Sequence, residues 1–543
     1  MRISIIVAVF NPGPALDIPV GSFLRQTMPR DEFEVIFVDD GSTDGSGKRL
    51  DQLARRHPHF RVIHIPNSGW PGRPRNLGID DATGRYVLFV DHDDWLADDA
   101  LAYLWEIAER ERADVLAPRE IGHGFGVPRR MFRRTILDAK LGRDDILALL
   151  TPHKLFRRSM LVEHGIRFPE GPRRLEDHHF VIQAYFAARR IIVTGDHPVY
   201  HWAKRDEGTN ATGMPFAHEL YYDNLRDILD IVDRNTEPGE LRDRLYAHWL
   251  RYKMIHKLLR PRFRTPGTRA RALYEEVRRL MDDRFPAAVD RFLPVGYRVV
   301  ARAVRADRFE VVVAAANLAH DLRLEVETRD VRVDGERVEI DLEHELRTAD
   351  GPVELGDQPT GRVWVPPAAL VEDLALDSED LRVDPAEGEL AIVARHRGLS
   401  VDYDEAMAYP GPGDVAADGR LAGRATFVVD PATFAAGAPL PEGTWETLLT
   451  AEFGGFRATR RVQGLSAIGA TGRRVRTTLS SHGHLAIVVG DPSAGRATPS
   501  RPRAPGTGTP APGIAVRARA AARRLLPPPA RRLVRRALDR VRG

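Results

Sequence analysis

The first ninety residues of the chain alternate between short apolar runs and polar turns. Apolar runs of strand length cover residues 3–10, 33–38 and 86–90, and each is followed by a turn rich in Asp, Asn or Gly. Residues 15–26 and 47–56, which lie between these runs, read as helical. Strands that alternate with helices predict βαβ units of a mostly parallel sheet. Ligands of such sheets bind beyond the carboxyl ends of the strands, so the polar turns are candidate site residues.

The pattern becomes helical over residues 216–296. Five residues at helix spacing predict one buried face: Leu245, Trp249, Tyr252, His256 and Leu259. The same stretch carries six cations with no acid between them: Arg251, Lys253, Lys257, Arg260, Arg262 and Arg264. A solvated helix face is the ordinary interpretation of such a run. An alternative, which we favour, is that the cations attract an acceptor that bears phosphates.

Short alternating runs separated by Gly, Asp and Pro begin near Arg298. The first of them is residues 309–313, for which we expect a strand. Runs of this kind predict β-sandwich domains, one over residues 297–389 and a second over residues 390–490. Neither half of this region shows a catalytic constellation.

The carboxyl-terminal segment differs in composition from the rest of the chain. Residues 491–513, rich in Pro, Gly, Ala, Ser and Thr, predict a disordered linker. Residues 496–543 contain thirteen arginines and one aspartate, a net charge of +12 in a chain whose total is +3. Within residues 514–543, an apolar stripe surrounded by arginines predicts a helix that lies in an anionic membrane surface. The alternative is a disordered tail that binds polyanions indiscriminately.

Composition adds limits on the class of protein. At 543 residues the chain predicts three or four domains. It has no cysteine, which excludes disulfides and Cys-zinc sites. Because no apolar run has the length of a membrane span and the sequence enters a strand at once, we expect a cytoplasmic protein. Its basic tail would make it peripheral on the inner face of the membrane. We expect no nucleic-acid partner.

An acidic tetrad, Asp91-His92-Asp93-Asp94, directly follows the apolar run 86–90. Carboxylates that cluster where a buried strand ends are suited to hold Mg²⁺ or Mn²⁺ together with phosphate oxygens. The alternative is a solvated acidic turn in which Asp94 caps the next helix.

A Gly-spaced segment, residues 122–126, lacks the Lys of a phosphate-binding loop. We expect it to form an active-site lid or an acceptor loop.

Taken in order, these motifs resemble the inverting family 2 glycosyltransferases, over about the first two hundred residues. The matching segments are residues 4–11, 38–44, 67–69, 75–78, 84–94 and 176–177. The resemblance implies a GT-A fold, that is, an α/β catalytic domain with a Rossmann-like, mostly parallel sheet over residues 1–215. It also implies a UDP-sugar donor and a divalent metal cofactor, Mn²⁺ or Mg²⁺.

The resemblance assigns five residues to donor binding. Ala8 and Phe10 would meet the uracil, with Phe10 in place of the more usual Tyr. Asp40 would accept a hydrogen bond from the base. Asn67 and Arg75 would contact the nucleotide and the diphosphate, since a guanidinium binds phosphate through two nitrogens. The structural alternatives are an Asx-type turn around Asp40 and a helix-surface cation at Arg75.

The acidic tetrad takes the remaining donor and metal roles that the resemblance implies. Asp91 would contact the ribose and share the metal, His92 would lie against the donor, and Asp93 would bind the metal. His201 is a further candidate metal ligand, although a histidine in this position is more often a packing residue.

Glu176 and Asp177 resemble the acidic pair that carries the catalytic base. Inverting transfer requires one carboxylate to remove the proton of the attacking hydroxyl, a role that the resemblance gives to Asp177. Glu176 would tune the pKa of Asp177 or hold the acceptor. Acids at a helix amino terminus are the structural alternative, and both interpretations can hold together.

The domain order is similar to that of the wall teichoic acid glycosyltransferases that transfer N-acetylglucosamine to poly(ribitol phosphate). That similarity implies a homotrimer and an anionic cell-envelope glycopolymer as acceptor, with UDP-GlcNAc as one candidate donor. We therefore expect a metal-dependent inverting glycosyltransferase. The alternatives are a non-catalytic polymer-binding or scaffold protein, or a transferase that acts on another polysaccharide or a lipid-linked acceptor.

Overall fold

The computed structural model describes residues 1–124, 126–203, 218–359, 361–411, 413–435, 437–465 and 474–490. All of them belong to one compact unit that spans Met1–Thr498. Phe125 and the predicted linker and tail, residues 491–543, lie outside the described residues. Among the helices of the described ranges, none combines the length and the apolar composition needed to cross a membrane.

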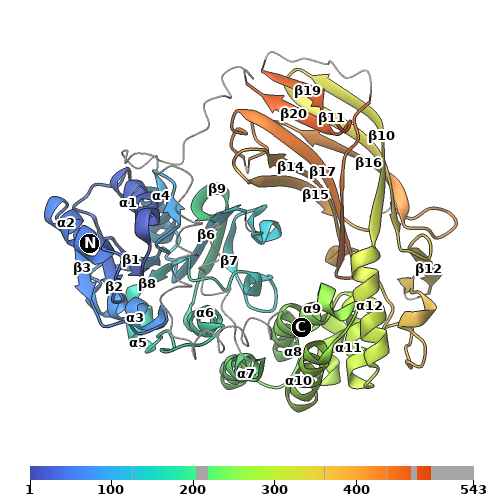
Figure 1. The fold of residues 1–543 in the computed structure, drawn as a ribbon, viewed down its shortest axis with the longest axis horizontal. Coiled ribbons are helices and arrows are strands. Elements are labelled where there is room, and N and C mark those ends of the chain that lie inside the picture. Colours follow the sequence, from blue (N-terminus) through green and yellow to red (C-terminus); the bar gives the residue numbers. More distant parts are fainter. Residues whose placement is uncertain are drawn as a thin grey trace, which may run out of the picture. The chain divides into compact units, whose positions relative to one another are not determined.

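The amino-terminal region is built on one nine-stranded sheet with the order β3-β2-β1-β4-β8-β6-β9-β5, with β7 paired to β9 (Figure 1). The strands are β1 (Ile3–Val9), β2 (Phe33–Asp39), β3 (Phe60–His64), β4 (Tyr86–Phe89), β5 (Trp95–Leu96), β6 (Val115–His123), β7 (Ile136–Ala139), β8 (Leu155–Arg157) and β9 (Ile191–Ala203). Strands β3, β2, β1 and β4 run parallel to one another, whereas β8 is antiparallel to β4 and β6, and β9 is parallel to β6. The predicted parallel sheet is confirmed, with antiparallel additions beyond β4.

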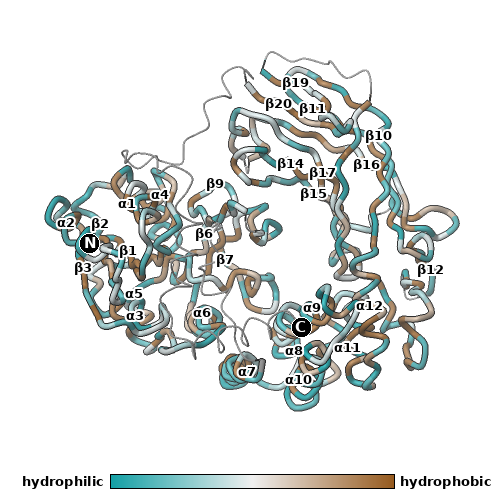
Figure 2. The backbone as a smooth tube through the Cα atoms, viewed as in Figure 1, coloured by the Kyte–Doolittle hydropathy of each residue, from teal (hydrophilic) through white to brown (hydrophobic). Residues whose placement is uncertain are grey.

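Helices cover both faces of this sheet. They are α1 (Asp17–Leu24), α2 (Ser46–Arg56), α3 (Gly72–Asp81), α4 (Ala100–Arg110), α5 (Arg158–Glu163) and α6 (Glu176–Ala187). Successive side chains of β1 enter two different cores: Ile6 belongs to one, and Ile5 and Val7 belong to the other. Because both faces are buried, strands β1, β2 and β4 are mostly apolar; Figure 2 colours apolar residues brown. Helix α3 packs closely on β1 at Gly78, where a Cβ would lie 2.3 Å from Ile6 Cγ2.

A helical region follows and extends further than the sequence predicted. Its helices are α7 (His218–Asn235), α8 (Glu240–Trp249), the π-helical turn η5 (Leu250–Ile255), α9 (His256–Leu258), α10 (Thr268–Arg284), α11 (Val295–Arg305) and α12 (Phe309–Asp321). The strand expected at residues 309–313 is therefore wrong, because this run lies in α12. A short Val-rich run fits a strand or a buried helix equally well, and here Val311, Val312, Ala315 and Ala316 form a buried helical face.

The predicted buried face of residues 245–259 is confirmed in part. Leu245, Trp249 and Leu259 are buried, but Tyr252 is 37% exposed. Tyr252 lies in η5, where a π-helical turn contains more residues than an α-helical turn and shifts the following side chains around the axis. Periodicity at 3.6 residues cannot anticipate this shift.

The remaining described residues form β-structure, as predicted. A three-stranded sheet contains β10 (Arg323–Asp334), β11 (Arg337–Arg347) and β16 (Ala422–Val429), and β12 (Glu354–Gln358) pairs with β13 (Gly361–Val365). A six-stranded sheet contains β14 (Glu389–His396), β15 (Asp402–Ala408), β17 (Gly443–Phe453), β18 (Phe456–Arg461), β19 (Val475–Leu479) and β20 (Leu485–Val489). These sheets do not follow the expected division at residue 390, because β16 pairs with β11 of the first half.

Candidate active site

Polar turns meet where the parallel strands β1, β2 and β4 end. Asn11 follows β1, Asp39 and Asp40 lie at the end of β2, and the acidic tetrad follows β4. Asn11 has a positive φ of 45° and its side-chain oxygen accepts a 2.8 Å hydrogen bond from the backbone of Thr43. The turns after β1 and β2 are thereby joined, at the sheet edge where ligands of such folds bind.

Arg75 links the acidic tetrad to the second acidic pair. Its Nη2 donates a 3.0 Å hydrogen bond to Asp91 and its Nη1 a 2.8 Å hydrogen bond to Asp177. The side chain is 6% exposed, comes from α3 and lies over the ring of Phe168. Burial disfavours its charge, but Asp177 and Asp91 outweigh that effect and raise the pKa of Arg75. Arg75 is thus a buried cation between two carboxylates, and the helix-surface interpretation is wrong.

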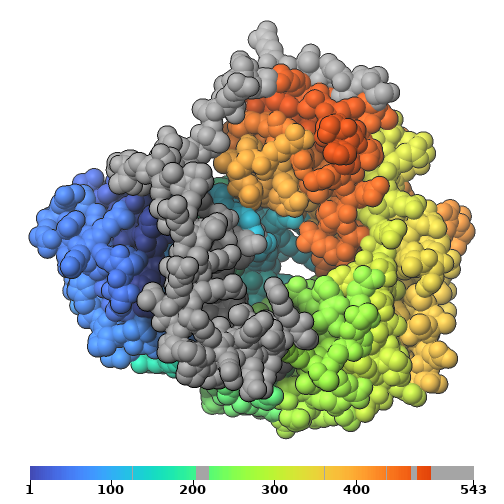
Figure 3. Space-filling model, viewed as in Figure 1, coloured from blue at the N-terminus to red at the C-terminus, as the bar shows by residue number. Residues whose placement is uncertain are grey.

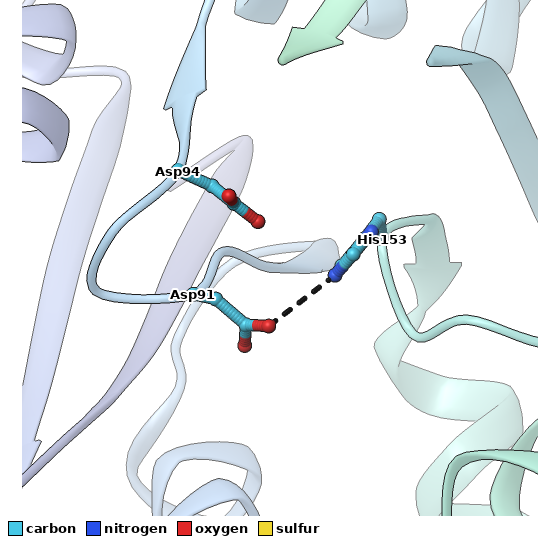
Figure 4. Close-up of side chains that lie close together, drawn as sticks. All are labelled: Asp91, Asp94 and His153. Carbon is cyan, nitrogen blue, oxygen red and sulfur yellow. Dashed lines mark hydrogen bonds and ion pairs between the residues drawn. The ribbon is translucent and has the colours of Figure 1, made fainter. Parts of the chain in front are cut away.

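Around Asp91 a second set of contacts involves a histidine that the sequence did not single out. His153 Nε2 lies 3.5 Å from Asp91 Oδ2 (Figure 4), and the His153 ring stacks on Tyr200. Tyr200 in turn donates a 2.7 Å hydrogen bond to Asp94 and accepts one from the backbone of Asp91. Although burial opposes it, the charge of Arg75 and the bond with His153 hold the pKa of Asp91 well below its usual range.

His153 itself lies between two carboxylates. Its Nδ1 is 3.6 Å from Glu120, whose carboxylate also accepts a 2.9 Å hydrogen bond from Thr151. Burial lowers the pKa of His153, but Asp91 and Glu120 raise it more, to about 10. With this pKa, His153 carries a positive charge between the two carboxylates near neutral pH.

Asp91, Asp94 and His153 each direct one ligand atom into a space in which all three atoms lie within 4.8 Å of one another (Figure 4). Burial and the neighbouring Asp91 raise the pKa of Asp94 well above its usual range. Two carboxylate oxygens and one imidazole nitrogen suit Mn²⁺, and two oxygens also suit Mg²⁺. The residues present therefore fit the divalent cation that the sequence predicts. Asp94 does not cap a helix, because the next element is strand β5.

Two predicted metal ligands are not members of this three-residue cluster. Asp93 belongs to the same turn and is partly buried. His201 lies on β9, stacks on Trp95 and has its Nδ1 2.9 Å from His123 Nε2. Burial lowers the pKa of His201 to about 3. Its surroundings are those of a packed aromatic residue, the alternative that the sequence left open.

Glu176 and Asp177 open helix α6, so acids lie in its first turn as predicted. Burial and the charge of Asp177 raise the pKa of Glu176 to about 7. Burial also raises the pKa of Asp177, and the Arg75 charge opposes this shift without cancelling it. Carboxylates with raised pKa values are suited to proton transfer near neutral pH.

The residues predicted to bind the nucleotide lie at the ends of β1 and β2. Phe10 is 45% exposed, which leaves a ring face available for stacking. The backbone oxygen of Ala8 accepts a 3.1 Å hydrogen bond from His92, which joins the end of β1 to the acidic tetrad. Asp40 accepts two hydrogen bonds from Ser68, at 2.7 and 2.9 Å.

Asn67 supports the same turn, since its Nδ2 donates a 2.9 Å hydrogen bond to the backbone oxygen of Asp40. This contact holds the segment after β3 against the end of β2. The turn around Asp40 is therefore fixed by local hydrogen bonds. The Asp40 carboxylate keeps further lone pairs that can accept a hydrogen bond from the uracil of a donor.

Two lysines, Lys154, which is buried, and Lys253, which is partly buried, act electrostatically on Asp177. Lys154 is 1% exposed and donates a 2.5 Å hydrogen bond to the backbone of Thr151, and burial lowers its pKa to about 8. Lys253 comes from the π-helical turn η5, and burial lowers its pKa to about 8. The charges of both interact with Asp177. Lys253 belongs to the predicted basic stretch, so that stretch contributes at least one cation to the site.

Sequence reasoning missed His153, Lys154 and Glu120. His153 and Lys154 follow the apolar residues Leu149 and Leu150 in a loop that matches no motif, and Glu120 lies inside strand β6. The one available signal was Glu120 beside Arg119 in the middle of strand β6, because a carboxylate that is buried there requires a partner.

Comparison with known proteins agrees with this geometry. Residues 4–192 match the model of glycosyl transferase family 2, and residues 218–316 match the glycosyl transferase TarS linker domain. The chain is 36% identical to the poly(ribitol-phosphate) β-glucosyltransferase of Bacillus spizizenii over 43% of its own length and 37% of that protein. It is 33% identical to the poly(ribitol-phosphate) β-N-acetylglucosaminyltransferase TarS of Staphylococcus aureus over 46% of its length and 44% of that protein. The chain thus matches less than half the length of these curated relatives.

Solved structures of S. aureus TarS are similar in fold. TarS 1-349 in complex with UDP-GlcNAc aligns with 63% of this chain and 96% of that one, with 26% identity and a TM-score of 0.54. A longer TarS structure aligns with 90% of this chain and 85% of that one, also with a TM-score of 0.54 but with 19% identity, and so supports the fold alone. Residues 4–192 thus match a glycosyl transferase family 2 domain, and residues 218–316 match a linker domain of the TarS type.

Proposed function

We propose that this protein is a metal-dependent inverting glycosyltransferase that moves a sugar from a UDP-sugar to a hydroxyl group of a polyol-phosphate polymer. One observation carries the proposal. Arg75 bonds both Asp91, beside the candidate cation cluster, and Asp177, the candidate base. A single buried cation thus links the two groups that the transfer requires, at the edge of a family 2 domain.

The donor is a UDP-sugar. TarS 1-349 forms a complex with UDP-GlcNAc, and the Bacillus relative is named as a glucosyltransferase. UDP-GlcNAc and UDP-glucose are therefore the first candidates. In this chain the exposed ring of Phe10 stacks on the uracil, and Ala8 and Asp40 contact the nucleoside. Asn67 and His92 hold the turns that bear these groups.

The divalent cation is held by residues of the acidic tetrad together with His153. Asp91 and Asp94 provide oxygens and His153 a nitrogen, and Asp93 lies in the same turn. When bound, the cation neutralises the charge of the diphosphate leaving group. Arg75 supports Asp91 from the other side, and a guanidinium at this position also attracts the diphosphate.

Asp177 removes the proton of the acceptor hydroxyl. Arg75 bonds only Oδ1 of Asp177, and we assign Oδ2 to the incoming hydroxyl. Burial raises the pKa of Asp177, which makes the carboxylate a stronger base. Glu176 tunes this base through its charge. A β-linked product, which the names of the relatives specify, requires inversion of an α-linked UDP-sugar, and a single base on the acceptor side meets that requirement.

The acceptor is an anionic polymer. Both relatives named above act on poly(ribitol-phosphate). Lys253 interacts with Asp177, and Lys257, Arg260 and Arg262 belong to the same basic stretch of the linker domain. Arg251 and Arg264 differ, since they bond Glu452 and Asp321 respectively, acids supplied from outside the stretch. We assign the acceptor phosphates to the remaining four cations.

Two further parts of the proposal concern assembly and location. The resemblance to the teichoic acid enzymes supports a homotrimer. The basic stripe of residues 514–543 supports attachment to an anionic membrane surface on the cytoplasmic side, although those residues lie outside the described part of the chain.

A donor and acceptor screen tests the proposal. The purified full chain is incubated with UDP-GlcNAc or UDP-glucose, Mn²⁺ and poly(ribitol phosphate), and UDP release and labelled polymer are measured. We expect transfer that requires both the acceptor and the cation and that Asp177→Asn abolishes. Polymer binding without any UDP release from either donor would instead support the non-catalytic scaffold alternative.

A further inference from the structure

A cavity of about 610 Å³ lies between one wall, formed by β6 and the segment that follows it, and the six-stranded carboxyl-terminal sheet. One wall includes Arg119, Gly124 and Phe132, and the other includes Arg395, Ser400 and Tyr403. The two walls are joined directly, since Gly124 N donates a 3.0 Å hydrogen bond to the backbone oxygen of Ser400. In Figure 3 the teal surface of the first region is seen beside the orange surface of the second.

The Gly-spaced segment singled out in the sequence forms part of this wall. Gly122, Gly124 and Gly126 line the cavity. Gly124 has a φ of +79°, which favours glycine, but a Cβ added at Gly126 would meet nothing within 4 Å. Crowding therefore does not require glycine at Gly126. Without a side chain, Gly126 leaves its backbone polar groups accessible to a molecule in the cavity.

The cavity has an excess of guanidinium groups. Five arginines line it, Arg119, Arg129, Arg395, Arg397 and Arg457, with three acids, Glu120, Asp402 and Glu446. Two of the arginines are paired in the cavity, since Arg395 bonds both oxygens of Asp402 and Arg397 bonds Glu446. Arg129 lies farther from acids, at 3.5 Å from Asp404 and 3.9 Å from Asp402.

Arg119 and Arg457 have no carboxylate partner among the described residues. Arg119 donates from Nη1 to the backbone oxygens of Phe132 and Gly195, and its buried Nε has no hydrogen-bond acceptor there. Burial lowers the pKa of Arg119, the effect expected for a guanidinium whose charge is not compensated. Arg457 is exposed on β18. An unsatisfied donor on a partly buried guanidinium is costly, so Arg119, together with the exposed Arg457, points to an anion that occupies the cavity.

The cavity is also connected to the active site. Glu120 lines it, and the same carboxylate lies 3.6 Å from His153, which is 3.5 Å from Asp91. A residue of the cavity wall, Glu120, is therefore a direct neighbour of His153, a member of the candidate cation cluster. A volume of about 610 Å³ is within the range of sites that hold ligands, about 300–1,000 Å³.

We propose that this cavity is a second acceptor subsite, which binds a phosphate-bearing segment of the polymer at a distance from the unit that receives the sugar. The inference rests on the proposed function for the identity of the polymer. Arg119, Arg129 and Arg457 bind phosphate oxygens of the polymer. A polymer held at two subsites is retained between transfers, because binding at the second subsite becomes intramolecular once the first is occupied.

Hydrogen exchange of the full chain localises the binding. Exchange is measured with and without poly(ribitol phosphate) for the wild type, Arg457→Ala and the matched control Arg460→Ala. Arg460 lies on the same strand but does not line the cavity, and the basic tail is identical in all three proteins. We expect the polymer to protect amides of residues 119–124 and 395–403 in the wild type and Arg460→Ala, and to lose this protection in Arg457→Ala.

Transfer kinetics provide the second readout. Arg457→Ala should raise the KM for the long polymer about tenfold without changing kcat, because one charge-assisted contact is lost. With an acceptor of one repeating unit, all three proteins should have the same KM and kcat. Equal protection and equal KM in Arg457→Ala and Arg460→Ala would overturn the subsite. Protection of the cavity by inorganic phosphate alone, at the same phosphate concentration, would show a single-anion site and overturn the polymer assignment.

The same experiment separates this inference from the proposed function. A wild type that transfers sugar but shows no Arg457-dependent protection supports the function and refutes the subsite. A wild type that releases no UDP but shows polymer protection that depends on Arg457 refutes the function and supports the anionic subsite.

Discussion

Arg75 donates a 2.8 Å hydrogen bond from Nη1 to Oδ1 of Asp177. The two residues are 102 positions apart in the chain, and α3 and α6 bring them together. The bond fixes the carboxylate that we assign as base, and it leaves one oxygen for the acceptor. Because Nη2 of Arg75 donates to Asp91, the position of the proposed base Asp177 depends on the same side chain that supports Asp91 at the proposed donor site.

Asp177→Asn is predicted to separate donor binding from transfer. The amide occupies the same space and still accepts from Arg75 through its oxygen, but it cannot take the acceptor proton. We expect UDP affinity within about threefold of the wild type and kcat lower by about a thousandfold or more, since a base contributes roughly 10²–10⁴-fold. Calorimetry with UDP and Mn²⁺ and a transfer assay measure the two quantities. Retention of turnover would assign the base elsewhere.

Arg75→Met is predicted to lower both stability and transfer. Removal of the buried cation leaves two carboxylates without their common partner, which costs about 3–5 kcal/mol for a buried pair. We expect a lower melting temperature and loss of transfer. Arg73→Ala is the matched control, because Arg73 is exposed on the same helix. An Arg75→Met protein as stable as Arg73→Ala would show that the two carboxylates do not need the cation.

The sequence predicted the parts of this site that are local. Strand, turn and helix boundaries follow from apolar runs and polar turns, whereas the roles expected of Asp91 and Asp177 rest on the resemblance to the family 2 glycosyltransferases. The sequence could not predict His153, because its role depends on the packing of the loop after residue 149 against Tyr200 and the end of β4. The contact with Asp91 joins residues 62 positions apart and leaves no periodic signal.

The fold shows the same limit. Residues 309–313 satisfy the pattern of a strand and of a buried helix, and the helix forms because α12 packs against α11 and the turn at residues 261–263. Tyr252 was expected on a buried face, but the π-helical turn rotates it toward solvent. Both errors arise where tertiary contacts decide between local alternatives of similar free energy.

The identity of the histidine metal ligand can be tested directly. The sequence predicted His201, whereas the structure groups His153 with Asp91 and Asp94. We expect His153→Gln to weaken Mn²⁺ binding at least about tenfold and to reduce stabilisation of the protein by Mn²⁺. His201→Gln should leave Mn²⁺ affinity unchanged, since His201 contacts His123 and Trp95. Calorimetry with Mn²⁺ measures the affinity and thermal melting verifies the fold. The opposite pattern would return the ligand role to His201.

The stability of the catalytic domain is predicted to fall in mild acid because of His59. This side chain is 6% exposed and packs between the rings of Phe33 and Phe60. Burial, together with the charges of Arg30 and His57, lowers its pKa from 6.5 to about 4. Between these two pH values the unfolded chain binds a proton that the folded chain does not, so stability decreases as pH falls through this window.

His59→Leu removes this linkage. The free energy of unfolding of the variant, relative to the wild type, should therefore improve as pH is lowered from 7 to 4.5. Urea unfolding at several pH values measures the difference. A difference that does not change with pH would show that His59 is protonated in the folded protein as readily as in the unfolded chain.

The carboxyl-terminal tail is predicted to attach the protein to anionic membranes. In residues 530–541 the apolar stripe of Leu533, Val534, Leu538 and Val541 is surrounded by arginines. Each basic residue near an anionic surface contributes about 1 kcal/mol and each buried CH₂ group about 0.8 kcal/mol. The full chain should therefore co-sediment with vesicles that contain anionic lipid, and less so at high salt. Deletion of residues 514–543 should leave the protein in the supernatant with its transfer activity intact.

A second variant, in which Leu533, Val534 and Leu538 are changed to Ser, keeps every charge. If the amphipathic helix is the anchor, this variant also stays in the supernatant, whereas binding equal to that of the full chain would identify the tail as a disordered polycation.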